Sequence, residues 1–261
     1  MKLKYFQVDS FTNEVFKGNP ACVVQLTEWL DEKLLLKIAK EFAVAETAFF
    51  IFEEGEFQLR WFTPDLEIDL CGHATLAAAF VIKSCLNYQS NEIYFNTMSG
   101  KLKVEVFNDT YFLNFPSRKA SASVLPKEIK KALSIQPKEI YKSRDYMLIY
   151  EAQSDVENIK INIEYFNQIN LGYGGVIISS IGNSTDFVSR FFTPQATILE
   201  DPVTGSSHCS LIPYWSSKLN KNKMIATQLS KRGGLLKCQN MLDRVKIGGH
   251  AVLFASGEFY F

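Results

Sequence analysis

The sequence contains no long hydrophobic run and no excess of either charge. Its longest mainly apolar stretch, residues 74–82, is far shorter than the roughly 20 residues that a helix needs to cross a bilayer. Lys and Arg together number 28, as do Asp and Glu, so the chain has no net positive field to hold a nucleic-acid backbone. We therefore expect a protein that binds neither a membrane nor nucleic acid.

Cysteine occurs in an odd number and without regular spacing. None of the five cysteines forms a C-x-x-C pair, the spacing typical of zinc sites and redox pairs. The first residues alternate charged and apolar side chains, whereas a secretory signal needs a continuous apolar stretch after its basic start. These features predict a cytoplasmic protein without disulfide bonds or structural zinc.

Signatures of cofactor and metal binding are missing too. Neither G-x-G-x-x-G nor a Walker A pattern occurs, and the G-x-G within residues 171–175 precedes strand-like residues where a dinucleotide site needs a helix. His73, His208 and His250 form no i, i+4 pair, and carboxylates do not cluster near them in the sequence. We expect neither a cofactor nor a metal ion.

What the sequence does contain is an internal repeat. With 261 residues, 47% of them hydrophobic, the chain is long enough for two domains with cores of their own. Phe62-Thr63-Pro64 recurs as Phe192-Thr193-Pro194, half a chain later, and each triplet is followed by a glycine that opens an apolar stretch, Gly72 and Gly205. We interpret the chain as a duplicated unit.

The elements predicted in the two copies are similar. Residues 31–42 carry apolar side chains at helical spacing on one face, and residues 72–84 are apolar nearly all round, which predicts a helix enclosed by a curled sheet. A second helix is expected from about Gly205, with Pro213 making its length uncertain. Alternating or β-branched segments predict strands at 2–9, 21–26, 47–52, 56–62, 91–96, 101–107, 111–115, 146–150, 175–180, 186–192, 224–229, 234–238, 245–247 and 252–259.

The predicted fold class is therefore α+β, with two pseudo-symmetric domains, each a β-barrel-like sheet around a central helix. We place the domains at residues 1–117 and 118–261, with the possibility that the last strand crosses back to the first domain. The polar stretch 116–126 is the expected joint.

The two copies differ at Glu46. At an offset of 130 positions, Val176 in the second copy stands opposite it, so one copy has a carboxylate where the other has a core aliphatic residue. Apolar neighbours would desolvate this carboxylate and raise its pKa toward the range useful for general acid and base catalysis. The alternative is a glutamate at a strand end that faces solvent.

Two predicted helix starts carry further polar groups. Cys71-Gly72-His73 opens the first enclosed helix, and Asp201 with Gly205 and Ser206 precedes the second. Free N–H groups and the helix dipole at such starts suit a carboxylate ligand. The alternative is structural: Asp201 or Thr204 caps the helix, His73 is a satisfied buried histidine, and Cys71, for which we favour this interpretation, is an inert small hydrophobe.

With these residues in place, the chain resembles the PhzF-like isomerase family, named after a phenazine-biosynthesis enzyme and sharing the diaminopimelate-epimerase fold. The resemblance runs nearly end to end and rests on ordered landmarks, which are Asp9-Ser10-Phe11-Thr12, Gly18-Asn19-Pro20-Ala21, Glu46-Thr47-Ala48-Phe49, Leu70-Cys71-Gly72-His73-Ala74-Thr75, Glu200-Asp201-Pro202-Val203-Thr204-Gly205-Ser206, Lys231-Arg232-Gly233-Gly234 and Ile247-Gly248-Gly249-His250-Ala251. It implies an active site in the cleft between two similar domains, no cofactor, and a homodimer.

The resemblance also implies roles for individual residues. Glu46 would shuttle a proton between carbons of a small carboxylic-acid substrate, with His73 and Asp201 assisting. The backbone at Gly72, His73, Gly205 and Ser206 would hold the substrate carboxylate. Epimerases of this fold use two facing thiols; Cys71 fits the first place, but Asp201 stands in the second, which disfavours a two-thiol racemase.

Two other functions stay open at this stage. The chain could be a non-catalytic member of the same fold that binds a metabolite or another protein. A hydrolase built from Cys71, His73 and Asp201 is a weaker alternative, because it requires the thiolate and the imidazole to be in contact. The substrate itself is not indicated by any motif.

Overall fold

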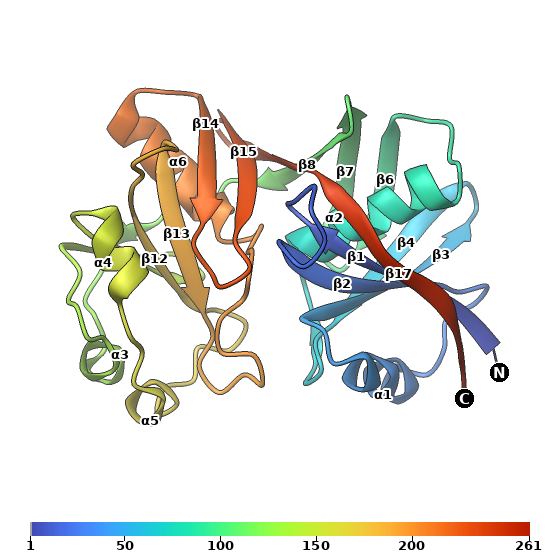
Figure 1. The fold of residues 1–261 in the computed structure, drawn as a ribbon, viewed down its shortest axis with the longest axis horizontal. Helices are drawn as coiled ribbons and strands as arrows, with labels where there is room; N and C mark the ends of the chain where they lie inside the picture. Colours follow the sequence, from blue (N-terminus) through green and yellow to red (C-terminus); the bar gives the residue numbers. More distant parts are fainter. Residues whose placement is uncertain (1) are drawn as a thin grey trace. The chain divides into compact units, whose positions relative to one another are not determined.

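The computed structural model describes residues 2–261, which form two compact units. Unit 1 consists of the chain up to Phe115 together with Ile247–Phe261, and unit 2 is Pro116–Lys246. In Figure 1 the first unit is blue to green with a red C-terminal strand, and the second runs from green to orange. Both units combine a mixed sheet with a few helices, as the α+β prediction required. Within residues 2–261 no helix has both the length and the apolar character of a membrane span.

Unit 1 is a mixed sheet with helices on both faces. β17 pairs with β1 and β1 with β2, both antiparallel; β2–β3 and β4–β6 are parallel, whereas β3–β4, β6–β7 and β7–β8 are antiparallel. Its elements are β1 (Lys2–Ser10), β2 (Asn19–Gln25), α1 (Glu32–Phe42), β3 (Glu46–Glu53), β4 (Glu56–Phe62), β5 (Glu67–Ile68), α2 (Gly72–Phe80), the π-helical η1 (Val81–Cys85), β6 (Glu92–Thr97), β7 (Gly100–Phe107), β8 (Thr110–Pro116) and β17 (Ala251–Tyr260).

Unit 2 has the same succession of pairings. β11–β12 and β13–β14 are parallel, and β10–β11, β12–β13 and β14–β15 are antiparallel. The elements, with the strand β16 that leads back to unit 1, are β9 (Ser121–Ala122), α3 (Lys127–Ala132), β10 (Glu139–Lys142), β11 (Tyr146–Ile149), α4 (Gln153–Asn158), α5 (Ile163–Phe166), β12 (Val176–Ile181), β13 (Phe187–Phe192), α6 (His208–Leu219), β14 (Lys223–Gln228), β15 (Gly234–Met241) and β16 (Arg244–Gly249). The repeat seen in the sequence is thus a repeat of topology.

An ion pair is repeated together with the strands. On β4, Arg60 donates two hydrogen bonds to Glu67, at 2.7 and 2.6 Å, and on β13 Arg190 donates two to Glu200, at 2.7 and 2.9 Å. Each guanidinium also lies over the phenylalanine of its own Phe-Thr-Pro triplet. The recurring triplet therefore marks a structural unit in which a planar cation is held by a carboxylate and a ring.

α1 and α2 cover opposite faces of the unit 1 sheet. Leu35 and Ile38 of α1 pack against Phe49 and Ile51 of β3. Because neighbouring side chains alternate across a strand, Ala48 and Phe50 face the other side, where α2 packs. Both faces of β3 are buried, which explains its continuous apolar sequence.

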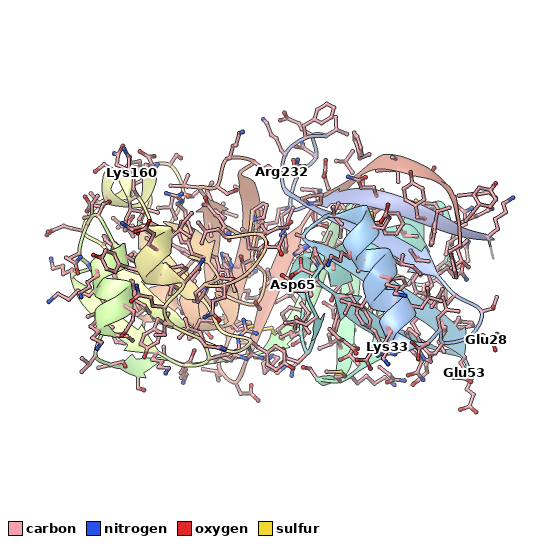
Figure 2. All side chains as sticks on the ribbon, turned by 90° about the horizontal axis from the view of Figure 1, so that it is seen from below. Glu28, Lys33, Glu53, Asp65, Lys160 and Arg232 are labelled. Atoms are coloured by element: carbon pink, nitrogen blue, oxygen red, sulfur yellow. The ribbon has the colours of Figure 1, made fainter. Side chains whose placement is uncertain are left out.

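α1 is the amphipathic helix that the sequence predicted, and α2 is the enclosed one. Asp31 accepts a hydrogen bond from the Lys33 N–H at the start of α1, and Lys33 lies at its surface (Figure 2). In α2 every residue from Gly72 to Ala79 is buried. α2 continues without a break into η1, so the helical segment ends at Cys85, close to the predicted end.

Two details differ from the sequence-based expectations, and a third, the length of α6, was left open by them. α6 begins at His208 rather than at about Gly205, because residues 205–207 form a turn. It then continues through Pro213 to Leu219; the carbonyl of Cys209, which loses its usual donor there, accepts a hydrogen bond from the Arg118 N–H at 2.9 Å. The expected joint, residues 116–126, contains β9, which pairs with β10, so it is not a free linker.

Candidate active site

Glu46 is the first residue of β3. The strand lies parallel to β2, with Glu46 in register with Ala21. Its side chain is only 14% exposed, so Glu46 is not the solvent-facing glutamate of the alternative interpretation. In unit 2 the first residue of the corresponding strand, β12, is the fully buried Val176. Unit 1 therefore has a carboxylate at a strand position where unit 2 has a buried aliphatic side chain.

His73 comes to the same place from the start of α2. Its ring is 2% exposed, and Nε2 lies 3.0 Å from Oε2 of Glu46. Apart from this contact, neither of these buried atoms has a hydrogen-bond partner anywhere in residues 2–261. Buried polar atoms nearly always have a hydrogen-bond partner, and an exception calls for an explanation, such as a role in catalysis.

Cys71 completes the cluster on the opposite edge of the imidazole. Its Sγ lies 3.6 Å from Nδ1 of His73. Burial, helped by the charge of Glu46, raises the pKa of the Cys71 thiol to about 11. Cys71 is therefore a thiol at neutral pH, and the thiolate that a cysteine hydrolase requires is not formed.

His73 is the group in this cluster that titrates toward the charged form. Burial disfavours a charge on its ring, but the interactions with Cys71 and Glu46 outweigh burial, and the pKa of His73 is raised well above its ordinary value of 6.5. Because Cys71 is protonated at neutral pH, Glu46 is the partner that stabilises the imidazolium there.

Two residues of the β1–β2 hairpin hold His73 and were given no role by the sequence analysis. The Oγ–H of Ser10 donates to the carbonyl of His73 at 2.8 Å, and Nδ2 of Asn19 lies 2.9 Å from His73 Nδ1. Both residues are fully buried. They belong to the landmarks Asp9-Ser10-Phe11-Thr12 and Gly18-Asn19-Pro20-Ala21, which was the available signal, but a polar residue beside glycine and proline reads equally well as a turn residue.

The start of α2 has backbone N–H groups that are not capped by an oxygen side chain. Cys71 is the N-cap residue, and its side chain makes no capping hydrogen bond. The first N–H groups of a helix have no partner within the helix, and Gly72 brings no side chain in front of them. This is the arrangement that suits a carboxylate.

The remaining predicted site residues form a separate group in unit 2. Thr204 Oγ1 donates to the carboxylate of Asp201, and Gln228 joins them by accepting from the Thr204 N–H and donating to the Asp201 carbonyl. The Ser206 hydroxyl, in the turn before α6, accepts from Arg144 at 3.0 Å. Ser207, the N-cap residue of α6, makes no capping bond with its side chain. Asp201 is thus held by the turn rather than used as the N-cap.

The other two histidines are placed differently from His73. His208 is fully buried and its Nδ1–H donates to the carbonyl of Thr204 at 2.9 Å; burial lowers its pKa to about 4, so it is neutral. His250 contacts the Asp109 carbonyl through Nδ1 at 2.9 Å. Neither lies beside a carboxylate as His73 does.

Glu46, Cys71 and His73 are also the one His/Cys/Asp/Glu cluster of metal-ligating size in the described chain, with their ligand atoms within 4.8 Å of one another. However, Cys71 lies at Nδ1 of the ring and Glu46 at Nε2, so no single ring nitrogen faces both. Each ring nitrogen of His73 thus already faces one of the other two groups.

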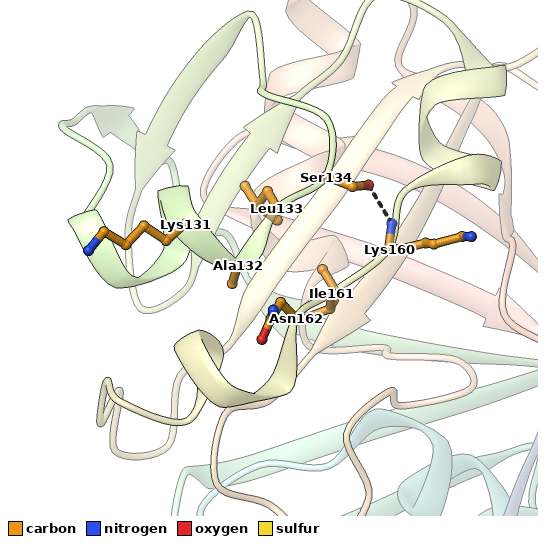
Figure 3. A pocket seen from close by; sticks show the side chains of 7 residues that line it. All are labelled: Lys131, Ala132, Leu133, Ser134, Lys160, Ile161 and Asn162. Atoms are coloured by element: carbon orange, nitrogen blue, oxygen red, sulfur yellow. Dashed lines mark hydrogen bonds between the residues drawn. The ribbon is translucent and has the colours of Figure 1, made fainter.

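A shallow pocket in unit 2 offers no comparable chemistry. It has a volume of about 220 Å³ and lies where residues 131–134 meet residues 160–162. Figure 3 shows that the side chains of Lys131 and Lys160 point to opposite sides, so they do not form a joint anion site. Ser134 is occupied as the acceptor of a hydrogen bond from the Lys160 N–H at 2.8 Å.

Comparison with known proteins identifies relatives over nearly the whole chain. The model of the phenazine biosynthesis-like (PhzC/PhzF) protein family matches residues 8–257. An uncharacterised isomerase of Pseudomonas aeruginosa is 42% identical, covering 99% of this chain and 98% of its own. A crystal structure of a PhzF family protein of Enterococcus faecalis is 43% identical and superposes with a TM-score of 0.94 over the whole of both chains.

A protein of much lower sequence identity has the same fold. A hydroxyproline epimerase from Agrobacterium vitis shares the fold with a TM-score of 0.62 at 8% identity, covering 98% of this chain and 92% of its own. The fold is therefore epimerase-like, as the sequence landmarks implied. The chain belongs to the phenazine biosynthesis-like, or PhzC/PhzF, family, and it is an isomerase.

Proposed function

We propose that this isomerase moves a proton between carbons of a small carboxylic acid without a cofactor, with Glu46 as the general acid and base. The observation that carries the proposal is the 3.0 Å contact between Glu46 and His73, both of whose facing atoms are buried and otherwise unsatisfied. A structural ion pair would be expected to have its remaining hydrogen-bonding capacity satisfied. An active site leaves that capacity to the substrate, and its hydrogen bonds often align only when substrate is bound.

The reaction would consist of two proton transfers. The ionised carboxylate of Glu46 removes a proton from a substrate carbon, and the electron pair of that C–H bond is delocalised into the substrate. The proton is then returned from Glu46 to a carbon, at a new position or on a new face, so that substrate and product have the same composition. His73, whose pKa is raised well above its ordinary value, lies 3.0 Å from Glu46 and within reach to donate a proton.

The substrate would be held through its carboxylate. Gly72 and His73 offer the open N–H groups at the start of α2, and Gly205 and Ser206 offer those of the turn before α6. Asp201, fixed by Thr204 and Gln228, would assist as an acceptor. We further propose that the enzyme works in the cytoplasm as a homodimer, in keeping with the family resemblance and with an odd number of unpaired cysteines.

Solvent exchange tests the reaction. Small carboxylic acids are screened for binding by ligand-observed NMR, and each ligand is then incubated with the protein in D2O. The proposal expects deuterium to enter a carbon-bound position of at least one ligand, detected by proton NMR and mass spectrometry. Tight binding of acids with no exchange in any of them would instead favour the non-catalytic binding protein.

A further inference from the structure

Asn19 and Glu46 hold the two nitrogens of the same imidazole. Nδ2 of Asn19 lies 2.9 Å from Nδ1 of His73, and Oε2 of Glu46 lies 3.0 Å from Nε2. Asn19 is 0% exposed and the His73 side chain is 2% exposed. The ring is therefore fixed between an amide and a carboxylate, away from bulk solvent.

The hairpin that carries Asn19 is fixed to α2. Ser10 and Asn19 are partners in the β1–β2 register, and Ser10 also holds the His73 carbonyl through its hydroxyl. Gly18, just before Asn19, has φ +64°, and a Cβ there would lie 2.1 Å from the Ser10 carbonyl oxygen. A glycine is thus required to bring Asn19 to this position.

The neighbouring strand brings the carboxylate. β2 and β3 are parallel, and Ala21, two residues after Asn19, is in register with Glu46. Three elements therefore determine the surroundings of His73: β2 supplies the amide, β3 the carboxylate, and α2 the ring. The titratable groups that face the ring are Glu46 from β3 and Cys71 from the start of α2.

The two partners differ in what they can do chemically. An ionised carboxylate only accepts hydrogen bonds, so Glu46 favours a proton on Nε2 whether the ring is neutral or charged. An amide has a donor end and an acceptor end. Its NH2 group suits an unprotonated Nδ1, and its oxygen, after a half-turn of the amide, suits a protonated Nδ1. With Nε2 committed to Glu46, the change of charge takes place at Nδ1, which faces Asn19 at 2.9 Å and the Cys71 Sγ, more distantly, at 3.6 Å.

We propose that Asn19 is a positioning residue that fixes neutral His73 as the Nε2–H tautomer directed at Glu46, and that rotation of its amide keeps the ring partnered when Nδ1 becomes protonated. His73 can then change its charge in a buried site without losing a hydrogen bond. The tautomer assignment is independent of the reaction; its consequence for turnover rests on the proposed function.

The direct test is ¹⁵N NMR of the protein labelled at its three histidines, titrated through and above the pKa of His73. The signals are assigned with His208→Asn and His250→Asn. We expect neutral His73 to carry its proton on Nε2. In Asn19→Asp, which keeps the shape of the side chain, a carboxylate faces Nδ1, so we expect His73 to stay protonated over an additional 1–3 pH units, about the effect of an adjacent opposite charge.

A second variant and an internal control separate this role from mere packing. Asn19→Leu removes the donor, so we expect the population of the Nε2–H tautomer to fall, whereas His208, in unit 2, should titrate as in the parent. The proposal is overturned if neutral His73 carries its proton on Nδ1, or if Asn19→Asp leaves its tautomer and titration unchanged. If Asn19→Leu does not fold, the tautomer and titration of His73 in Asn19→Asp test the proposal.

The pH dependence of the deuterium-exchange rate tests whether His73 also takes part in the proposed reaction. Asn19→Asp should shift the pH–rate profile of deuterium exchange in the direction in which it shifts the His73 titration. If the NMR result is as expected but the pH–rate profile is unchanged, the tautomer assignment stands, and the participation of His73 in proton transfer is wrong.

Discussion

Oε2 of Glu46 lies 3.0 Å from Nε2 of His73, on elements that only the fold brings together. Glu46 is the first residue of a strand and His73 lies in the first turn of a helix, and the strand that carries Asn19 lies beside both. A carboxylate that faces a buried imidazole favours the charged form of the ring. Substitutions of these two residues and their neighbours are therefore the most direct tests of the site.

Replacing Glu46 by glutamine should remove proton transfer but not folding. The amide keeps the shape of the side chain but cannot carry the proton, so we expect deuterium exchange to fall by about 100- to 10,000-fold, the usual contribution of a general acid or base. Glu53→Gln, an exposed position at the other end of β3, is the matched control and should exchange at the parental rate. Near-parental exchange in Glu46→Gln would show that the carrier is another residue, with His73 next in line.

Asp201→Asn should be much milder. The hydroxyl of Thr204 already donates to the Asp201 carboxylate, and an asparagine oxygen can accept the same hydrogen bond. If Asp201 orients rather than transfers, the variant keeps measurable turnover, with a loss well below that of Glu46→Gln in the same exchange assay. Equal losses in the two variants would mean that Asp201 exchanges protons itself.

His208 predicts a loss of stability in acid. Its folded pKa of about 4 lies below the ordinary 6.5, so the unfolded chain binds the additional proton as the pH falls from 6.5 to 4. The contribution of neutral His208 to the free energy of unfolding is complete above pH 6.5. It is lost as the pH falls from 6.5 to 4, by about 3 kcal/mol in total. Urea unfolding across this range should therefore give a steeper pH dependence for the parent than for His208→Asn, with His250→Asn as control. Parallel curves would contradict a buried neutral His208.

Alkylation should distinguish the cysteines. Cys85 is half-buried, whereas Cys22, Cys71, Cys209 and Cys238 are buried. With iodoacetamide at pH 7 and peptide mapping by mass spectrometry, we expect Cys85 to react first and Cys71 much more slowly, because Cys71 is buried and burial raises the pKa of its thiol to about 11. Cys85→Ser should abolish the fast phase. A Cys71 that reacts as fast as Cys85 would restore the cysteine hydrolase as a candidate.

The two Arg–Glu pairs should contribute unequally to stability. Besides binding Glu200, Arg190 donates to the carbonyls of Val156 and Ile159, at 3.1 and 3.3 Å, whereas Arg60 has carboxylates as its partners. Lysine cannot reproduce this fork. We expect Arg190→Lys to lower the free energy of unfolding by about 2–4 kcal/mol and Arg60→Lys by about 1–2 kcal/mol. A larger loss for Arg60→Lys in denaturant titrations would refute this ranking.

The sequence predicted those features that depend on local pattern. The enclosed helix was found because residues 72–84 are apolar on every side, and the strands because their side chains alternate or are β-branched. Glu46 was found by its mismatch with Val176, a difference that the duplicated topology makes meaningful. In each case the information lay in a local pattern or in the comparison of two repeated segments.

Features that depend on contacts between distant segments were not predicted. No pattern in the sequence indicated that Asn19 faces His73, because this contact requires both the β1–β2 register and the position of α2. The continuation of α6 through Pro213 likewise depends on the Arg118 N–H, supplied from far away in the chain. The start of α6 at His208 follows from the turn at residues 205–207, where glycine and serine fit a turn as well as a first helical turn.

The pairing of β17 with β1 bears on how the protein is made. β17 continues the unit 1 sheet from Lys2↔Tyr260 to Ser10↔Ala251, yet the ribosome reaches it only after the whole of unit 2. At about 5–20 residues per second, β1 waits on the order of ten seconds with an open edge. Exposed strand edges recruit other chains. The nascent protein is therefore most prone to aggregation during this interval, and chaperone binding should be concentrated there.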